Sequence, residues 1–155
     1  MPNLQDEIGK KQPFDLPEEE AYLNVRRSAA TLESFFGRLF RKAGLSEATY
    51  NVLRILRAAG DDGRCWGEIR QDLVVPVPDV TRLIDRLEKT GLCERQRSVT
   101  DRRKVFITIT PKGKDVVDRL DEPVRGMLRG RLGHMNEGDL RKLSSLLEQI
   151  RDQDT

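Results

Sequence analysis

The spacing of apolar residues changes twice along this chain, and the two changes constrain its fold more than any other feature. Up to Gly91, and again beyond Thr110, apolar residues recur every three or four positions, which is typical of amphipathic helices. Between these points, residues 104–109 are rich in β-branched and aromatic residues, and residues 93–97 can pair with them as the other arm of a hairpin. The pattern predicts a mainly α-helical fold with one small β-hairpin.

Prolines, a glycine and a serine predict where the helices before the hairpin begin and end. Pro17 suits the first position of a helix, Gly44 suits the left-handed conformation that ends one, and Ser46 can cap the next. We expect Pro76 or Pro78 in the first turn of the last of these helices, where the missing N–H does no harm. The predicted helices cover residues 17–43, 46–59, 66–73 and 78–90, after an extended arm at residues 1–14.

Two further helices are predicted after the hairpin. Thr110 and Pro111 suit the cap and the first residue of one helix, and Asn136 suits the start of another. The apolar face of the last helix includes Leu140, Leu143, Leu147 and Ile150. A chain of 155 residues can bury one core of ordinary size, so we interpret residues 1–155 as a single domain.

The order of elements between residues 66 and 109 is short helix, turn, helix and hairpin, which is the order of a winged helix-turn-helix. The formal net charge of +2 does not by itself indicate a nucleic-acid partner, but residues 95–104 hold five bases and one acid. A helix fits the major groove of DNA, and a basic loop can cross phosphates or enter the minor groove. The sequence therefore predicts double-stranded DNA as the partner. The contacts expected from the exposed face of the helix at 78–90 are Asp79, Thr81, Arg82 and Arg86.

Three stretches on and around the hairpin carry a family pattern. Residues 80–95 read VTRLIDRLEKTGLCER, residues 101–103 read DRR, and residues 108–113 read TITPKG. With their spacing, they resemble the MarR family of bacterial regulators over residues 45–113. The resemblance implies that Arg103 enters the minor groove and that Asp101 holds the hairpin tip in shape through a hydrogen bond to an arginine. It also implies phosphate contacts from Arg97 and Arg102. The sequence departs from the family at residues 74–78, VVPVP, where members more often carry small polar residues.

The resemblance also implies a homodimer. In the family, the first and last two helices interleave, which here corresponds to residues 15–44 and 111–152 and leaves residues 45–110 as the DNA-binding lobe. Many members lose DNA affinity when a ligand binds, so we expect a ligand-responsive repressor of a pseudo-palindromic operator. The implied ligand is a small aromatic or phenolic effector, and no metal or other cofactor is expected. The dimerisation residues expected from the last helix are Leu140, Leu143, Leu147 and Ile150.

Two other functions stay open at this stage. A winged fold also serves as a protein–protein interaction module without DNA binding, and Cys65 or Cys93 could make the chain a thiol-based redox-responsive regulator. We expect both cysteines to be buried as small apolar residues. An enzyme is not expected, because we find no nucleophile–base set or phosphate-binding glycine loop, and His134 is the only histidine.

The sequence carries no sign of export. The N-terminus lacks the regions of a signal peptide, and no apolar run approaches the roughly 20 residues that span a bilayer. We therefore expect a cytoplasmic protein with no membrane partner.

Overall fold

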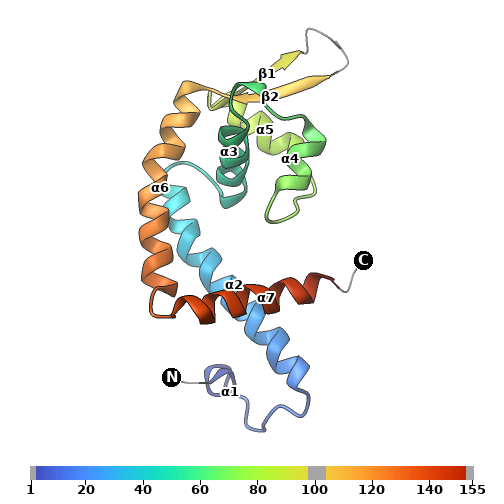
Figure 1. Cartoon of the computed structure of the whole chain (residues 1–155), viewed down its shortest axis with the longest axis vertical. Helices are drawn as coiled ribbons and strands as arrows, with labels where there is room; N and C mark the ends of the chain where they lie inside the picture. The colour runs from blue at the N-terminus through green and yellow to red at the C-terminus, as the bar shows by residue number, and fades with distance from the viewer. Residues whose placement is uncertain (1–2, 98–103, 153–155) are drawn as a thin grey trace. The chain divides into compact units, whose positions relative to one another are not determined.

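The computed structural model describes residues 3–97 and 104–152. Within it the chain forms two compact units, Met1–Tyr50 and Asn51–Thr155, and each is described by itself (Figure 1). Helix α3, Glu47–Ala59, begins in the first unit and continues into the second. The prediction of a mainly helical chain with one β-hairpin is confirmed.

The first unit contains a short helix that the sequence patterns did not predict. Residues Leu4–Glu7 form α1, because Asn3 caps the turn by accepting a hydrogen bond from the backbone N–H of Asp6 at 2.9 Å. The side chain of Leu4 is buried, and the carboxylate of Glu7 pairs with the Nε of Arg27 at 2.5 Å. The prediction of an extended arm is therefore wrong over these four residues, where Asn3 caps a single helical turn.

The long helix α2, Pro17–Lys42, ends as predicted in a tight glycine turn. Gly44 has a φ of 74°, and its N–H donates to the carbonyl of Arg41 at 3.0 Å. The N–H of Leu45 reaches back to the carbonyl of Phe40 at 2.9 Å, so the last turn of the helix is satisfied. Helix α3 then starts at the predicted cap, where the hydroxyl of Ser46 accepts from the N–H of Thr49 at 3.1 Å.

The second unit contains the winged helix-turn-helix and two long helices. After α3, its elements are the 3₁₀ turn η1 (Gly60–Asp62), α4 (Trp66–Asp72), α5 (Val80–Lys89), β1 (Cys93–Arg97), β2 (Val105–Ile109), α6 (Pro111–Leu132) and α7 (Glu137–Arg151). Helix α5 starts two residues later than predicted. Pro76 and Pro78 precede it, because Asp79 adopts the non-helical cap conformation and accepts a hydrogen bond from the N–H of Arg82.

The hairpin is a two-stranded antiparallel sheet in which Cys93 pairs with Ile109 and Arg97 with Val105. Arg64 adds a short bridge on the other side of β2, where its N–H and carbonyl exchange hydrogen bonds with Ile107 at 2.9 and 2.8 Å. This bridge joins the middle of β2 to a residue that lies two positions after the end of the 3₁₀ turn. The predicted hairpin is confirmed, with its second strand beginning one residue later than expected.

The core of the second unit comes from the predicted inner faces of α3, α4, α5, β2 and α6. The largest of its side chains with less than 2% exposure include Leu53, Leu56, Ile69, Ile84, Leu87, Ile107 and Val117. These residues bury one face of α5 and leave its other face outward.

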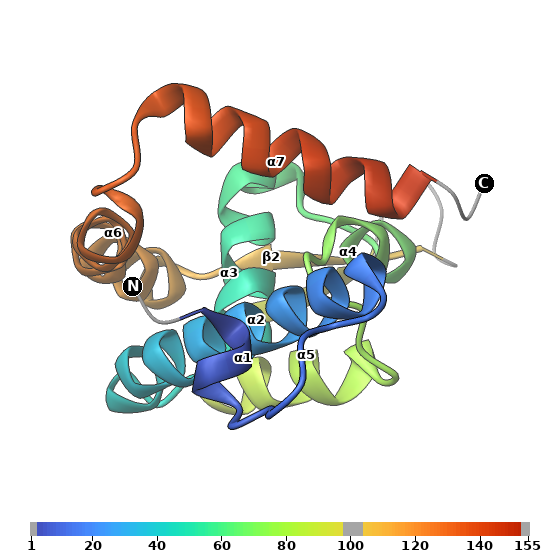
Figure 2. The ribbon, with the colours of Figure 1, turned by 90° about the horizontal axis from the view of Figure 1, so that it is seen from below.

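Helix α6 leads away from the hairpin (Figure 1), and α7 runs across the direction of α6, which Figure 2 shows almost end-on. Among the described residues of α7, none is buried, and Ile150 is 61% exposed. Leu143 and Leu146 are also exposed, so the described residues of the second unit leave much of the apolar face of this helix open. None of the described helices combines the length and apolar character that a membrane crossing requires.

Candidate nucleic-acid interface

Helix α5 presents three of the predicted DNA-binding residues on one exposed face. Thr81, Arg82 and Arg86 are exposed, whereas Val80, Ile84 and Leu87 on the opposite face are buried. The side chain of Arg82 is 87% exposed although it pairs with Asp79. The structure therefore brings these three residues together on a helix that is fixed from behind by its apolar face.

Asp79 lies at the N-terminus of α5 and serves the helix itself. Its Oδ1 accepts from the backbone N–H of Arg82, and its Oδ2 lies 3.1 Å from the Nε of the same arginine. The negative charge of the carboxylate is also stabilised by the positive end of the helix dipole. The prediction that Asp79 contacts DNA stays a prediction, and capping is the role that its hydrogen bonds establish.

Arg95 connects the hairpin to both helices of the helix-turn-helix. From β1, its guanidinium pairs with the carboxylates of Asp85 and Glu88 on α5. The same group lies over the ring of Trp66, the first residue of α4, at 5.1 Å from the centroid. The hydrogen bond to Asp85 raises the pKa of Arg95 above its ordinary value. Arg95 is one of the five bases of residues 95–104, and the charge pattern of that segment gave no sign of this structural role.

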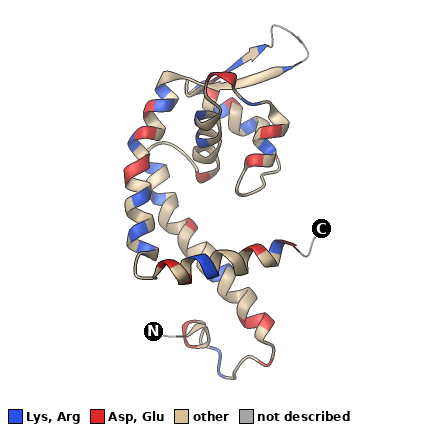
Figure 3. Cartoon of the chain, in the orientation of Figure 1, with Lys and Arg blue, Asp and Glu red and all other residues tan. Residues whose placement is uncertain are grey.

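The described part of the hairpin has basic residues near the ends of both strands (Figure 3). Arg97 is exposed at the end of β1, and Lys104 is exposed just before β2. The predicted contacts Asp101, Arg102 and Arg103 lie outside the described residues, so their roles stay predictions.

The C-terminal end of α5 is fastened to the start of α6. The hydroxyl of Thr110 donates to the carbonyl of Gly91 at 2.7 Å, and the Nζ of Lys112 donates to the carbonyl of Thr90 at 2.8 Å. A Cβ on Gly113 would lie 2.2 Å from the carbonyl oxygen of Leu92, so only glycine fits this close approach. The position of α5 is therefore tied to the first turn of α6.

The two cysteines occupy different environments. Cys93 is buried, as expected, and burial raises the pKa of its thiol to about 12. Cys65 is only half-buried and lies at the N-cap of α4. Its backbone N–H donates to the carboxylate of Glu68 at 2.8 Å. That hydrogen bond lowers the pKa of Glu68. The expectation that Cys65 is buried is therefore wrong, and the thiol of Cys93 stays protonated at neutral pH.

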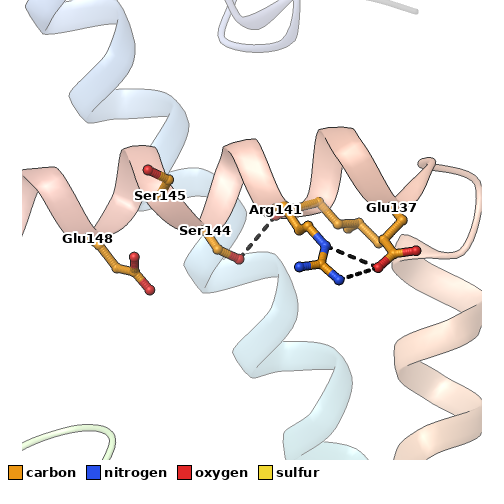
Figure 4. A pocket seen from close by; sticks show the side chains of 6 residues that line it. Glu137, Arg141, Ser144, Ser145 and Glu148 are labelled. Atoms are coloured by element: carbon orange, nitrogen blue, oxygen red, sulfur yellow. Dashed lines mark hydrogen bonds and ion pairs between the residues drawn. The ribbon is translucent and has the colours of Figure 1, made fainter.

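The described residues offer little for a metal or for a small molecule in the second unit. Residues 3–97 and 104–152 contain no group of histidine, cysteine and carboxylate side chains that could hold a metal ion. A shallow hollow lies along α7, and the residues that line it all come from that one helix, Arg141 and its partner Glu137 among them (Figure 4). This hollow is an open helix surface.

An aromatic cluster lies in the first unit. The rings of Phe40 and Tyr50 stack with centroids 4.5 Å apart, and Phe36 stacks on Phe40 at 6.4 Å. The hydroxyl of Tyr50 is buried and finds no hydrogen-bond partner among the described residues. A buried hydroxyl without a partner is energetically unfavourable.

Comparison with known proteins finds that the sequence and the fold are similar to those of one protein family. The family model that matches is the MarR family, over residues 45–105. The homoprotocatechuate degradative operon repressor of Escherichia coli is 24% identical over 130 residues, which is 84% of each chain. A solved MarR transcription factor from Planctomyces limnophilus is 36% identical, covers 88% of this chain and 99% of its own, and has a TM-score of 0.67.

A third similar protein is BpsR of Bordetella bronchiseptica, whose structure concerns the regulation of its DNA binding by 6-hydroxynicotinic acid. It is 21% identical, covers 85% of this chain and 98% of its own, and has a TM-score of 0.73. At this identity the likeness shows a shared fold.

Proposed function

This chain belongs to the MarR family of winged helix-turn-helix transcriptional regulators, and from that premise we propose that it represses transcription by binding a pseudo-palindromic operator as a homodimer. The observation that carries the proposal is the outward face of α5, where Thr81, Arg82 and Arg86 are exposed above a buried apolar face. A helix presented in this way fits the major groove and reads base edges. The family relatives are regulators rather than enzymes.

We infer separate roles for the helix and the hairpin. Thr81, Arg82 and Arg86 face base edges or adjacent phosphates, and Arg97 contacts a phosphate beside the groove. Arg102 and Arg103 extend these contacts from the hairpin tip, with Arg103 in the minor groove, where a narrow groove attracts a guanidinium. Asp79 and Asp101 hold the helix start and the hairpin tip in position. These two carboxylates act on DNA through the arginines that they orient.

We infer that a second copy of the chain covers the exposed apolar faces of the long helices. Leu140, Leu143, Leu147 and Ile150 lie on α7, which buries none of its described side chains. Tyr22 and Val25 are exposed on α2 in the first unit. Residues 15–44 and 111–152 then form the dimerisation module, and residues 45–110 form the DNA-binding lobe of a single MarR-type domain. Such a dimer would place two recognition helices about 34 Å apart, in successive major grooves.

We propose a small aromatic or phenolic effector as the regulating ligand. BpsR, which shares the fold, is regulated by 6-hydroxynicotinic acid. In this chain, support comes from the stacked rings of Phe36, Phe40 and Tyr50 and from the unpartnered hydroxyl of Tyr50. An aromatic ligand with a hydrogen-bonding group could satisfy that hydroxyl. We also propose that the protein acts in the cytoplasm, where a bacterial regulator meets its operator.

Two alternative functions, thiol-based regulation and protein binding without DNA, make different predictions. Regulation through a reactive thiol is disfavoured for Cys93, because burial raises its pKa to about 12. A protein-binding module would bind with little dependence on salt, whereas a DNA-binding protein that contacts several phosphates weakens steeply as salt rises.

The deciding experiment is selection of bound duplexes from random DNA with the purified full chain. Recovery of an inverted repeat, bound with a steep salt dependence, supports the proposal. Recovery of unrelated sequences whose binding is independent of salt would contradict it.

A further inference from the structure

Two arginines on the exposed face of α5 lie one helical turn apart and differ in how their side chains are held. The Nε of Arg82 lies 3.1 Å from the Oδ2 of Asp79, the residue that caps the helix. Within residues 3–97 and 104–152, no carboxylate pairs with the side chain of Arg86. The outward face of α5 therefore carries one arginine that is held by an acid and one that is not.

The carboxylate of Asp79 contacts Arg82 at two points. Its Oδ1 accepts a hydrogen bond from the backbone N–H of Arg82 at 3.1 Å, and its Oδ2 pairs with the side chain. One carboxylate therefore holds this arginine both at its backbone and at the start of its guanidinium group. A side chain that is already ordered loses little conformational entropy on binding, so Arg82 is preorganised for a partner.

The hydrogen-bond donors that Arg82 has left are those of its two terminal nitrogens. Neither Nη1 nor Nη2 donates to any residue that the structure describes, and the side chain is 87% exposed. A guanidinium group has donors only, and it holds them in one rigid plane. The exposed edge of Arg82 therefore fits a partner that presents two acceptors side by side.

DNA offers two partners of this kind, which are the phosphate oxygens and the edge of guanine. Asp79 and Arg82 together carry no net charge, and the carboxylate would repel a phosphate placed against the pair. A base edge is uncharged, so this repulsion does not arise. In the major groove, guanine alone presents two acceptors, O6 and N7. The pair therefore favours guanine over a phosphate.

We propose that Arg82 determines specificity by donating from Nη1 and Nη2 to the O6 and N7 of one guanine in each half-site, with Asp79 as its positioning residue. The proposal rests on the proposed function, which leaves open whether Arg82 faces a base or a phosphate. Arg82 lies in the first turn of α5, and the N-terminal residues of a recognition helix are those that contact base edges.

The test replaces single guanines of the selected operator by 7-deazaguanine, which lacks the N7 acceptor and still pairs with cytosine. Affinity is measured by fluorescence anisotropy over a range of salt concentrations with the unmodified full chain, Arg82→Ala and Asp79→Asn. Asparagine caps a helix as well as aspartate does, so this variant keeps the cap and removes the charge that holds the guanidinium. Arg129→Ala is the matched control, because this arginine also pairs with an acid, Glu122, but lies on α6.

At one guanine in each half-site, 7-deazaguanine should weaken binding by the unmodified chain about tenfold, the factor expected for losing one hydrogen bond from a charged donor. Arg82→Ala should bind both duplexes equally and keep the salt dependence of the unmodified chain. Asp79→Asn should reduce the difference to about threefold, because its arginine has to be ordered on binding. Arg129→Ala should keep the full difference. These results together support the proposal.

Three results would overturn the reading of guanine by Arg82. The first is that no guanine shows the effect, and the second is an equal effect in Arg82→Ala and the unmodified chain. The third is that Arg82→Ala weakens binding to every duplex alike and lowers the salt dependence, which would assign Arg82 to a phosphate.

The positioning role of Asp79 has its own contrary result, which is a full tenfold difference in Asp79→Asn. Each of these results leaves operator binding by the unmodified chain intact. A chain that binds no duplex at all overturns the proposed function as well.

Discussion

The guanidinium of Arg95 lies 5.1 Å from the centroid of the Trp66 ring. Trp66 is the first residue of α4, and Arg95 also pairs with Asp85 and Glu88 of α5. One side chain of β1 therefore contacts both helices of the helix-turn-helix. This contact fixes the direction of the hairpin relative to the recognition helix, and the spacing of DNA contacts depends on that direction.

Replacing Arg95 by glutamine should lower the free energy of unfolding by about 1–2 kcal/mol, since it removes a partly buried ion pair and a cation–π contact. Operator binding should weaken as well, because the hairpin loses its fixed direction. Urea unfolding and anisotropy measure the two effects. The matched control is Arg141→Gln, which removes an exposed pair with Glu137 on α7 and should change stability by less than about 0.5 kcal/mol. Equal effects of the two substitutions would refute the special role of Arg95.

Replacing Arg86 or Arg103 by alanine should each weaken operator binding by about 1–3 kcal/mol and leave the fold intact. The reason is the loss of a guanidinium contact with a base edge or with a groove. Titration of a labelled operator at fixed salt measures the change. Arg129→Ala serves as the control, since this arginine pairs with Glu122 on α6 away from α5. Unchanged binding by the Arg103 variant would remove the hairpin tip from the mechanism.

Replacing Leu143 and Leu147 together by glutamate should convert the dimer to monomers and abolish tight operator binding. Charged side chains on this face of α7 would have to be desolvated in the interface. Sedimentation velocity gives the mass, and circular dichroism checks that the helices persist. A Ser145→Glu variant adds a charge to the side of the same helix that lies opposite Leu143 and Leu147, and it should remain dimeric. If the double variant also sediments as a dimer, the interface lies elsewhere.

The raised pKa of Cys93, about 12 in the folded chain, makes a prediction at high pH. In the unfolded chain the thiol ionises at its ordinary, lower pKa, so above that value the unfolded state binds fewer protons than the folded state. The contribution of this thiol to the free energy of unfolding is therefore fully present at neutral pH. It decreases as the pH rises from about 8.5 towards the pKa of the thiol in the folded chain. The difference in unfolding free energy between the native chain and Cys93→Val should shrink over this range in urea titrations. A difference that stays constant would contradict the burial of the thiol.

The fold could be predicted from local signals because its helix ends use short-range chemistry. Thr110 and Asn136 cap helices as expected, and Gly44 and Gly91 end helices in the left-handed conformation. The start of α5 was misplaced by two residues because two signals compete there. Proline favours a first helical turn, but the side chain of Asp79 can accept the backbone hydrogen bond and fixes the cap at its own position.

The site could be predicted only in part. The exposed face of α5 follows from helical periodicity, so Thr81, Arg82 and Arg86 were identified together. The role of Arg95 could not be predicted, because its partners lie seven and ten residues away on another element. Such a contact depends on how the hairpin packs against α5, and periodicity within one element carries no information about that packing.

The hydrogen bonds that tie Thr90 and Gly91 to the first turn of α6 have a mechanical consequence. These contacts and the close packing of Gly113 against the carbonyl of Leu92 join α5 to α6 at one end. We therefore expect that a tilt of α6 would turn α5 with it, with a displacement that increases with distance from this joint. The end of α5 that bears Asp79 and Arg82 therefore sweeps farthest.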